Sequence, residues 1–209
     1  MTGRPTRLLL ATTNQGKLRE IHRILDEIPI ELVTLAAFPG IPVPEETGRT
    51  FGENARQKAL YYAAACGLPT VAEDSGLEID ALGGLPGVES ARFGGADSTY
   101  PEKFRLIYEA LRACGAATSP ARFVCAVAMA AGPDIAIETR GTIEGAIAPA
   151  SSGEQGFGYD PIFFYPPYDR TLAQVSEADK SAVSHRGQAF RAFRRALDRW
   201  LTDPDKRQG

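Results

Sequence analysis

Residues 122–147, with the sequence RFVCAVAMAAGPDIAIETRGTIEGAI, indicate the fold class, because two strand-like runs follow each other with only a turn between them. The runs cover 122–131 and 135–147, and Gly132, Pro133 and Asp134 separate them. Turn residues between two such runs predict a β-hairpin. A hairpin pairs its strands antiparallel, so at least this part of the sheet is expected to be antiparallel.

Outside the hairpin, helical and strand patterns alternate. Residues 16–27 carry apolar side chains at spacings of three and four, and the Ala-rich stretch 51–66 is closed by Gly67, so both predict helices. Further strands are expected at 7–11, 30–35, 70–73 and 162–165, and further helices at 101–114 and 184–200. Early alternation followed by a hairpin favours an α/β fold with a mixed β-sheet over a purely doubly wound one.

Length and composition set the domain count. The 209 residues correspond to one or two domains, and 44% hydrophobic with 23% charged residues is typical of a globular protein. We expect one domain over 1–209, with two lobes around a cleft and with flexible tails at 1–6 and 203–209. Its three cysteines have no CxxC spacing, which argues against a disulfide framework or a zinc site.

Charge and hydropathy exclude several classes of partner. With a net charge of −3, the chain lacks the excess of basic residues that is typical of a nucleic-acid-binding protein. No apolar run reaches the roughly 18 residues of a membrane span. The basic start MTGRPTR is followed by only four apolar residues, too few for a signal peptide. We therefore expect a cytoplasmic protein with no nucleic-acid or membrane partner.

A candidate anion site follows the first expected strand. The polar run between that strand and the next helix consists of Thr12, Thr13, Asn14, Gln15, Gly16 and Lys17. Backbone N–H groups at a helix N-terminus attract anions, and the lysine adds a positive charge. The run is not a Walker A loop, since GxxxxGK[ST] is absent. The alternative is an ordinary strand-to-helix turn with a surface lysine.

Two pairs of acids are candidate metal ligands. Glu45 and Glu46 precede Thr47-Gly48, while Glu73 and Asp74 are expected to end a short strand, with a glycine turn at Ser75-Gly76. Carboxylates at the end of a strand lie where α/β proteins bind ligands, and hard oxygen ligands suit Mg²⁺. Solvated loop acids are the alternative, and it is stronger for the first pair.

The third group of candidates is C-terminal. Phe157 lies in a glycine-rich loop with Gly158, Tyr159 and Asp160, and an aromatic face can stack on a base. Cations follow at Lys180, His185 and Arg186, where they could bind a carbonyl or a phosphate. His185 alone is more often a capping or surface residue. Anion loop, acids, aromatic and cations together describe a site for a nucleoside triphosphate.

Five segments make the resemblance specific. They are ATTNQGKLREI (11–21), EETGRTFGENARQKA (45–59), AEDSGLEIDALGGLPGVESARF (72–93), GEQGFGYDPIF (153–163) and EADKSAVSHRGQAF (177–190). In this order, over nearly the whole chain, they resemble the inosine/xanthosine triphosphate pyrophosphatase family, which clears non-standard purine nucleotides. Two positions depart from the family pattern: Thr13 stands where many relatives have Gly, and Glu73 stands where Asp is expected.

The resemblance implies a fold and a reaction. The fold would be an elongated mixed β-sheet flanked by helices, with two lobes, a central active-site cleft and a homodimeric assembly. The reaction would hydrolyse ITP, dITP, XTP or dXTP between the α and β phosphates, giving the monophosphate and pyrophosphate. The cofactor would be Mg²⁺, which neutralises the triphosphate while a carboxylate activates water.

The resemblance also implies a role for each matching residue. Glu45 and Asp74 would hold magnesium, with Glu73 as a further candidate ligand, and Asp74 would be the general base. Phe157 would stack on the purine, and His185 and Arg186 would read the base edge. The remaining substrate-binding residues would be Thr12, Thr13, Asn14, Gln15, Gly16, Lys17, Ser75, Gly158, Tyr159, Asp160 and Lys180.

Base selection and two rival functions follow from the same residues. Donors aimed at the 6-carbonyl of inosine or xanthosine would be left unpaired against adenine, which penalises adenosine triphosphate.

One rival function is that of a related pyrophosphatase for modified pyrimidine nucleotides, and the SHR motif at 184–186 argues against it. The other is a non-enzymatic nucleotide sensor, which would not need the acids.

Overall fold

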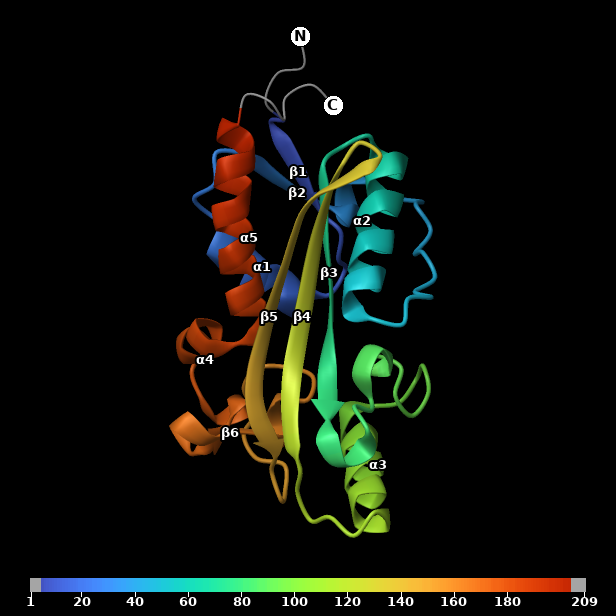
Figure 1. Cartoon of the computed structure of the whole chain (residues 1–209), viewed down its shortest axis with the longest axis vertical. Helices are drawn as coiled ribbons and strands as arrows, with labels where there is room; N and C mark the ends of the chain where they lie inside the picture. The colour runs from blue at the N-terminus through green and yellow to red at the C-terminus, as the bar shows by residue number, and fades with distance from the viewer. Residues whose placement is uncertain (1–4, 204–209) are drawn as a thin grey trace. The chain divides into compact units, whose positions relative to one another are not determined.

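The computed structural model describes residues 5–203 (Figure 1). The helices are α1 (Gln15–Leu25), α2 (Phe51–Cys66), α3 (Tyr100–Ala113), α4 (Glu177–Val183) and α5 (His185–Thr202). The strands are β1 (Arg7–Leu10), β2 (Glu31–Thr34), β3 (Thr70–Ile79), β4 (Pro120–Ala131), β5 (Asp134–Ile147), β6 (Phe163–Tyr165) and β7 (Arg170–Thr171). The tails expected at 1–6 and 203–209 fall mostly outside the described residues.

The strands form one mixed sheet with the order β2-β1-β3-β4-β5-β6-β7. Strand β1 pairs in parallel with both β2 and β3, whereas β6 pairs antiparallel with β5 and β7. Only Gly132 and Pro133 lie between β4 and β5, a connection too short for parallel neighbours. The expected α/β fold with a mixed sheet and a central hairpin is therefore confirmed.

The chain divides into two compact units, in agreement with the two lobes expected. The first unit contains the N-terminal part up to Asp74, residues 125–141 and the part from Arg186 onward; the second contains 75–124 and 142–185. None of the described helices is both long and apolar enough to span a bilayer.

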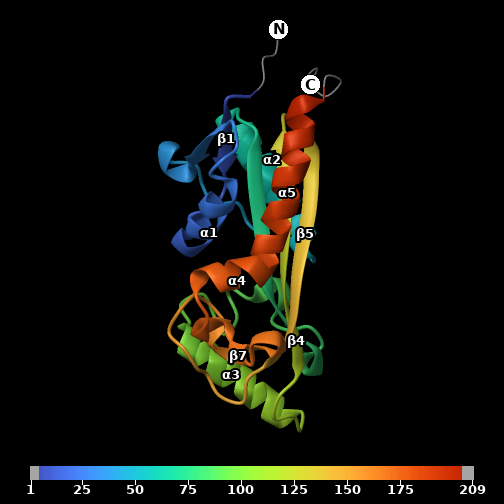
Figure 2. The ribbon, with the colours of Figure 1, turned by 90° about the vertical axis from the view of Figure 1, so that its left-hand side faces the viewer.

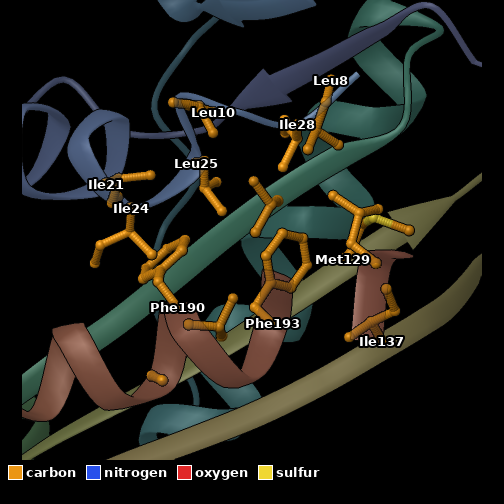
Figure 3. Packing of buried hydrophobic residues seen from close by; sticks show 14 of the residues in the cluster. Leu8, Leu10, Ile21, Ile24, Leu25, Ile28, Met129, Ile137, Phe190 and Phe193 are labelled. Atoms are coloured by element: carbon orange, nitrogen blue, oxygen red, sulfur yellow. The ribbon is translucent and has the colours of Figure 1, made fainter. Parts of the chain in front are cut away.

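The first unit packs helices on both faces of its strands. Figure 1 shows α1 and α5 on one face and α2 on the other. The α1 and α5 face is closed by a continuous apolar cluster, seen in Figure 3, to which Leu8 of β1, Val71 of β3 and Phe193 of α5 all belong. Helix α5 also runs along β5, as Figures 1 and 2 show. Thr139 Oγ1 of β5 donates to the carbonyl oxygen of Ala189 of α5 at 3.0 Å.

The second unit has its own core. Helix α3 places Phe104, Ile107 and Leu111 against apolar residues from the ends of three long strands, including Leu77 and Ile147. Thr99 begins the helix with a capping box, in which its side chain accepts from Glu102 N–H and the Glu102 carboxylate accepts from Thr99 N–H. Helix α4, which the sequence patterns did not predict, begins at the capping residue Ser176.

Strand β3 is much longer than predicted. The expected end at Glu73 and the glycine turn at Ser75-Gly76 are wrong, because the strand continues unbroken to Ile79. Gly76 keeps an ordinary negative-φ conformation, and continuing the strand buries Leu77 and Ile79 completely. Long-range pairing and burial thus override the local turn signal. Glu73 and Asp74 consequently lie within a strand.

Candidate active site

The loop after β1 has the geometry of an anion site. Asn14 caps α1, since its Oδ1 accepts from Lys17 N–H at 3.1 Å, and Thr12 Oγ1 accepts from Asn14 N–H at 3.2 Å. The loop side chains Thr13, Asn14 and Gln15 are exposed, and no acid occupies the first turn of α1. The positive end of the helix is therefore open to an anionic ligand. A pocket of about 280 Å³, which the loop lines together with part of the 34–43 segment, adjoins it.

The two neighbouring acids of β3 point to opposite faces of the sheet, because side chains alternate along a strand. Glu73 shares its face with Val71, which belongs to the α1 and α5 cluster, and it contacts Lys17 of α1. Asp74 faces the other way and contacts Asn54 and Lys58 of α2. The two carboxylates thus have different contact partners within the first unit.

Glu73 is the centre of a buried charge network. The residue is 3% exposed; its Oε1 pairs with Lys17 Nζ, and its Oε2 lies 3.5 Å from Arg186 Nη2. The Cys125 thiol donates to Oε2 at 3.4 Å. Burial opposes ionisation of Glu73, but the charges of Lys17 and Arg186 outweigh it and hold its pKa well below the usual range. Glu73 is therefore ionised at neutral pH, and its carboxylate contacts two cations.

The guanidinium group of Arg186 contacts two carboxylates, one through each terminal nitrogen. Its Nη1 donates to Glu20 Oε2 at 2.7 Å, while Nη2 faces Glu73, and the residue is 2% exposed. The structure thus brings Arg186 together with Lys17 in the first unit through a shared carboxylate. Glu20 was not singled out in the sequence, although it lies on α1 one helical turn from Lys17.

Asp74 lies in a second polar cluster on the α2 side. Asn54 Nδ2 donates to its Oδ2 at 2.9 Å, and Lys58 Nζ lies 3.6 Å from its Oδ1. Burial raises the pKa of Asp74; the attraction of Lys58 and the Asn54 hydrogen bond oppose the rise, while the charge of Glu46 adds to it. A carboxylate with a raised pKa is a better proton acceptor than an ordinary exposed aspartate.

Glu46, the second acid of the 45–46 pair, shares a counter-ion with Asp74. Lys58 Nζ lies 2.5 Å from Glu46 Oε1, so Glu46 and Asp74 share one ammonium group, whereas Glu45 is exposed. In this structure Glu46 is therefore the acid grouped with Asp74, and the role of Glu45 as a metal ligand stays a prediction. The spacing of Asn54 and Lys58 was the overlooked signal, since residues four apart on a helix share one face.

The donor set fits a magnesium ion that also binds substrate. No three His, Cys, Asp or Glu side chains within residues 5–203 form a complete metal cage. Mg²⁺, however, usually takes only one or two carboxylates and completes its shell with water and phosphate oxygens. Glu46 and Asp74 are two hard oxygen donors that already hold a cation, the Lys58 ammonium, between them.

The aromatic loop is organised within the second unit. Asp160 Oδ2 accepts from Phe157 N–H at 2.8 Å and from Lys180 Nζ at 2.6 Å. Lys180 Nζ also lies 4.4 Å from the centroid of the Phe157 ring. Tyr159 is buried, and its hydroxyl donates to the carbonyl oxygen of Ser90 at 2.8 Å. Of the predicted aromatics, half-buried Phe157 retains an accessible surface, whereas Tyr159 belongs to the core.

His185 and Ser75 also lie in the second unit. The His185 ring is buried and stacks on Phe123, with centroids 4.8 Å apart and planes at 17°. His185 is the first residue of α5, and the stacking contact fixes the plane of its imidazole ring. Ser75 is half-buried on β3, next to Asp74 in sequence.

The first unit holds a helix N-terminus with a lysine and two acids around an ammonium group, and the second unit holds a half-buried aromatic ring over another ammonium. The Ham1 family model matches residues 8–196, and the chain belongs to the Ham1 family. The family resemblance inferred from the five motifs is thereby confirmed.

The relatives extend over almost the full chain. A protein of Dictyoglomus thermophilum named dITP/XTP pyrophosphatase is 45% identical over 91% of this chain and 94% of its own length. A protein of the same name from Thermus thermophilus is 44% identical, over 98% of this chain and 97% of its own. The solved structure of a HAM1 protein from Coxiella burnetii superposes with a TM-score of 0.86 at 39% identity, covering 92% of this chain and 98% of that one.

Proposed function

We propose that this chain hydrolyses the non-standard purine nucleoside triphosphates ITP, dITP, XTP and dXTP to the monophosphate and pyrophosphate. The observation that carries the proposal is the Asp74 cluster, in which a carboxylate with a raised pKa lies beside Lys58 and Glu46. The names of the relatives, dITP/XTP pyrophosphatase, support the substrate class.

The chain's own groups account for most of the chemistry. Magnesium held by Glu46 and Asp74 would neutralise phosphate charge when bound. Lys17 and the N-terminus of α1 attract the triphosphate, and Asp74 accepts the proton of the attacking water. Phe157 stacks on the purine, and His185 and Arg186 donate to the 6-carbonyl of the base.

Pyrophosphate release from a panel of triphosphates, with and without magnesium, tests this function. The expected result is turnover of ITP and XTP that requires magnesium, with ATP a much poorer substrate. Preferential turnover of methylated pyrimidine triphosphates would support the rival pyrophosphatase. Binding without any pyrophosphate release would support a sensor.

The choice between Glu45 and Glu46 as the metal ligand can be tested by titration with magnesium. Glu46→Gln should raise the magnesium concentration for half-maximal rate about tenfold or more, because it removes one of two carboxylate donors. Glu45→Gln is the matched control, since it removes the neighbouring exposed carboxylate. A larger shift in Glu45→Gln than in Glu46→Gln would restore the original assignment.

The Arg186→Ala and Lys17→Ala variants should differ in how they change the selectivity among nucleoside triphosphates. Arg186→Ala should lower kcat/KM for ITP and XTP more than for ATP, reducing the discrimination by about 1–3 kcal/mol, because a donor to the 6-carbonyl is lost. Lys17→Ala should slow all triphosphates by a similar factor, because it acts on phosphates that they share. Values of kcat/KM for inosine, xanthosine, guanosine and adenosine triphosphates decide the matter. Uniform loss in both variants would make Arg186 a phosphate ligand.

A further inference from the structure

Asn54 of α2 is buried beside Asp74, with 0% of its surface exposed. Its Nδ2 donates to Asp74 Oδ2 at 2.9 Å, and its Oδ1 accepts from the backbone N–H of Gly48 at 2.8 Å. Burying an amide costs free energy unless its polar atoms are hydrogen-bonded, and both ends of this amide are. One side chain thus joins the carboxylate on β3 to the segment that precedes α2.

The two neighbours fix the orientation of the Asn54 amide. A backbone N–H can only donate, so Gly48 requires the oxygen end of the amide. An ionised carboxylate can only accept, so Asp74 requires the nitrogen end. Turning the amide round would place donor against donor and acceptor against acceptor. A side chain of similar size that lacks either a donor or an acceptor therefore cannot make the same connection.

Gly48 allows the segment to approach Asn54 closely. A Cβ built on Gly48 would lie 2.6 Å from Asn54 Oδ1 and 2.9 Å from the Asn54 backbone nitrogen. The φ angle of Gly48 is not positive, so space rather than backbone conformation requires glycine here. Because Gly48 follows Glu46 by two residues, this contact also limits where Glu46 can lie relative to Asp74.

Glu53 anchors the next residues of the same segment in a different way. Its Oε2 accepts from the N–H groups of Arg49 and Thr50, at 2.6 and 3.2 Å. Glu53 is exposed, and with Thr50 it forms the capping box at the start of α2. Glu53 and Asn54 therefore both hold the segment, and of the two it is Asn54 that also contacts Asp74.

We infer that Asn54 is a positioning residue, which sets the place of the segment carrying Glu46 and the orientation of the Asp74 carboxylate relative to each other. The inference rests on the proposed function, because the orientation of the carboxylate matters to the rate when Asp74 is the general base. The alternative is that Asn54 contributes only to folding, as a buried amide with satisfied hydrogen bonds. The two readings differ in what the loss of Asn54 does to kcat.

Asn54→Leu tests the effect on the reaction, because leucine is similar in size and offers neither a donor nor an acceptor. It should lower kcat for inosine triphosphate about 10- to 100-fold and change KM less than about threefold, since a misplaced base slows the chemical step rather than weakening binding. Thr70→Val is a matched control, because Thr70 is equally buried on β3 and donates to the Leu68 carbonyl oxygen at 3.0 Å. It should keep kcat within about threefold of the wild-type value. Equal losses of kcat in the two variants would overturn the inference.

Glu53→Ala separates anchoring of the segment from contact with Asp74. It removes the acceptor for Arg49 and Thr50 but leaves Asn54 in place, so kcat should stay within about threefold of the wild-type value. A fall in kcat as large as that in Asn54→Leu would mean that any loosening of the segment has this effect, and it would contradict a specific role of Asn54.

A double-mutant cycle tests whether Asn54 acts through Asp74. In an Asp74→Asn background, Asn54→Leu should lower kcat less than about threefold, because the group that it orients is already lost. A reduction in that background as large as in the otherwise wild-type protein would overturn the inference, since Asn54 would then act independently of Asp74.

Hydrogen exchange of the metal-free protein gives a readout that needs no substrate. The Gly48 amide proton should exchange slowly in the wild-type protein and in Glu53→Ala, and markedly faster in Asn54→Leu. An equal exchange rate of this proton in the wild-type protein and Asn54→Leu would refute the positioning role. If the wild-type protein hydrolysed no purine triphosphate while this exchange pattern held, the proposed function would fail and the positioning of the segment by Asn54 would stand.

Discussion

Asp74→Asn is expected to lower kcat by at least about 10²-fold while the protein remains folded. The substitution keeps the shape of the side chain and can keep the hydrogen bond from Asn54, but it removes the charge that accepts a proton and attracts a cation beside Lys58. Steady-state pyrophosphate release at saturating magnesium measures the effect, with circular dichroism as the check on folding.

Asp80→Asn is a suitable control for this experiment. Asp80 is a carboxylate of the second unit, partly exposed and paired with Arg122, outside both clusters. It should turn over substrate at a rate close to that of the wild-type protein. Wild-type turnover in Asp74→Asn itself would remove Asp74 from the mechanism.

Glu73→Gln is expected to destabilise the protein by about 3 kcal/mol, because it removes the carboxylate shared by the partly buried Lys17 and the buried Arg186, which keeps its ion pair with Glu20. Glu138→Gln is the matched control: it breaks the exposed pair with Arg56 and should cost at most about 1 kcal/mol. Urea unfolding of the three proteins measures both differences. Equal losses of stability would show that the Glu73 network contributes no more than a surface pair.

The pH dependence of this difference has a definite sign. The pKa of Glu73 is lower in the folded state than its ordinary value of 4.5, so its contribution is complete above that value. As the pH falls below about 4.5 towards the depressed folded-state pKa, the contribution is lost. The gap between wild type and Glu73→Gln should therefore be constant from about pH 7 to 5 and narrow below about pH 4.5.

Local patterns predicted the helices well because caps and periodicity act over a few residues. The expected helix at 51–66 coincides with α2, where Thr50 and Glu53 form a capping box and Gly67 ends the helix in a left-handed conformation. The last helix is predicted at 184–200 and found at His185–Thr202, with Phe190, Phe193 and Leu197 buried. The residues that determine where these helices begin and end lie within a few positions of one another, so the local sequence is enough to predict them.

The site was harder to predict because its groupings depend on faces of the sheet. The sequence presents Glu73 and Asp74 as a pair, yet strand alternation separates them, and only the long-range contacts of β3 reveal where the strand ends. Glu46 could be identified only through its ion pair with Lys58, which lies on α2, twelve residues further along the chain. Lys17, Asp160 and Lys180 were recognised as functional candidates, but their carboxylate and ammonium partners required the structure.

The alternation of side chains along β3 also limits how the gene can vary in length over the codons for this strand. Replacing a side chain between Val71 and Leu77 alters the contacts of that one residue, but deleting or inserting a single residue there would rotate every later position of the strand to the other face of the sheet. Such an indel upstream of the acids would place the second carboxylate against α1 and the first against α2, exchanging their counter-ions. Length variation among homologous sequences should therefore be confined to loops and be absent from these seven codons.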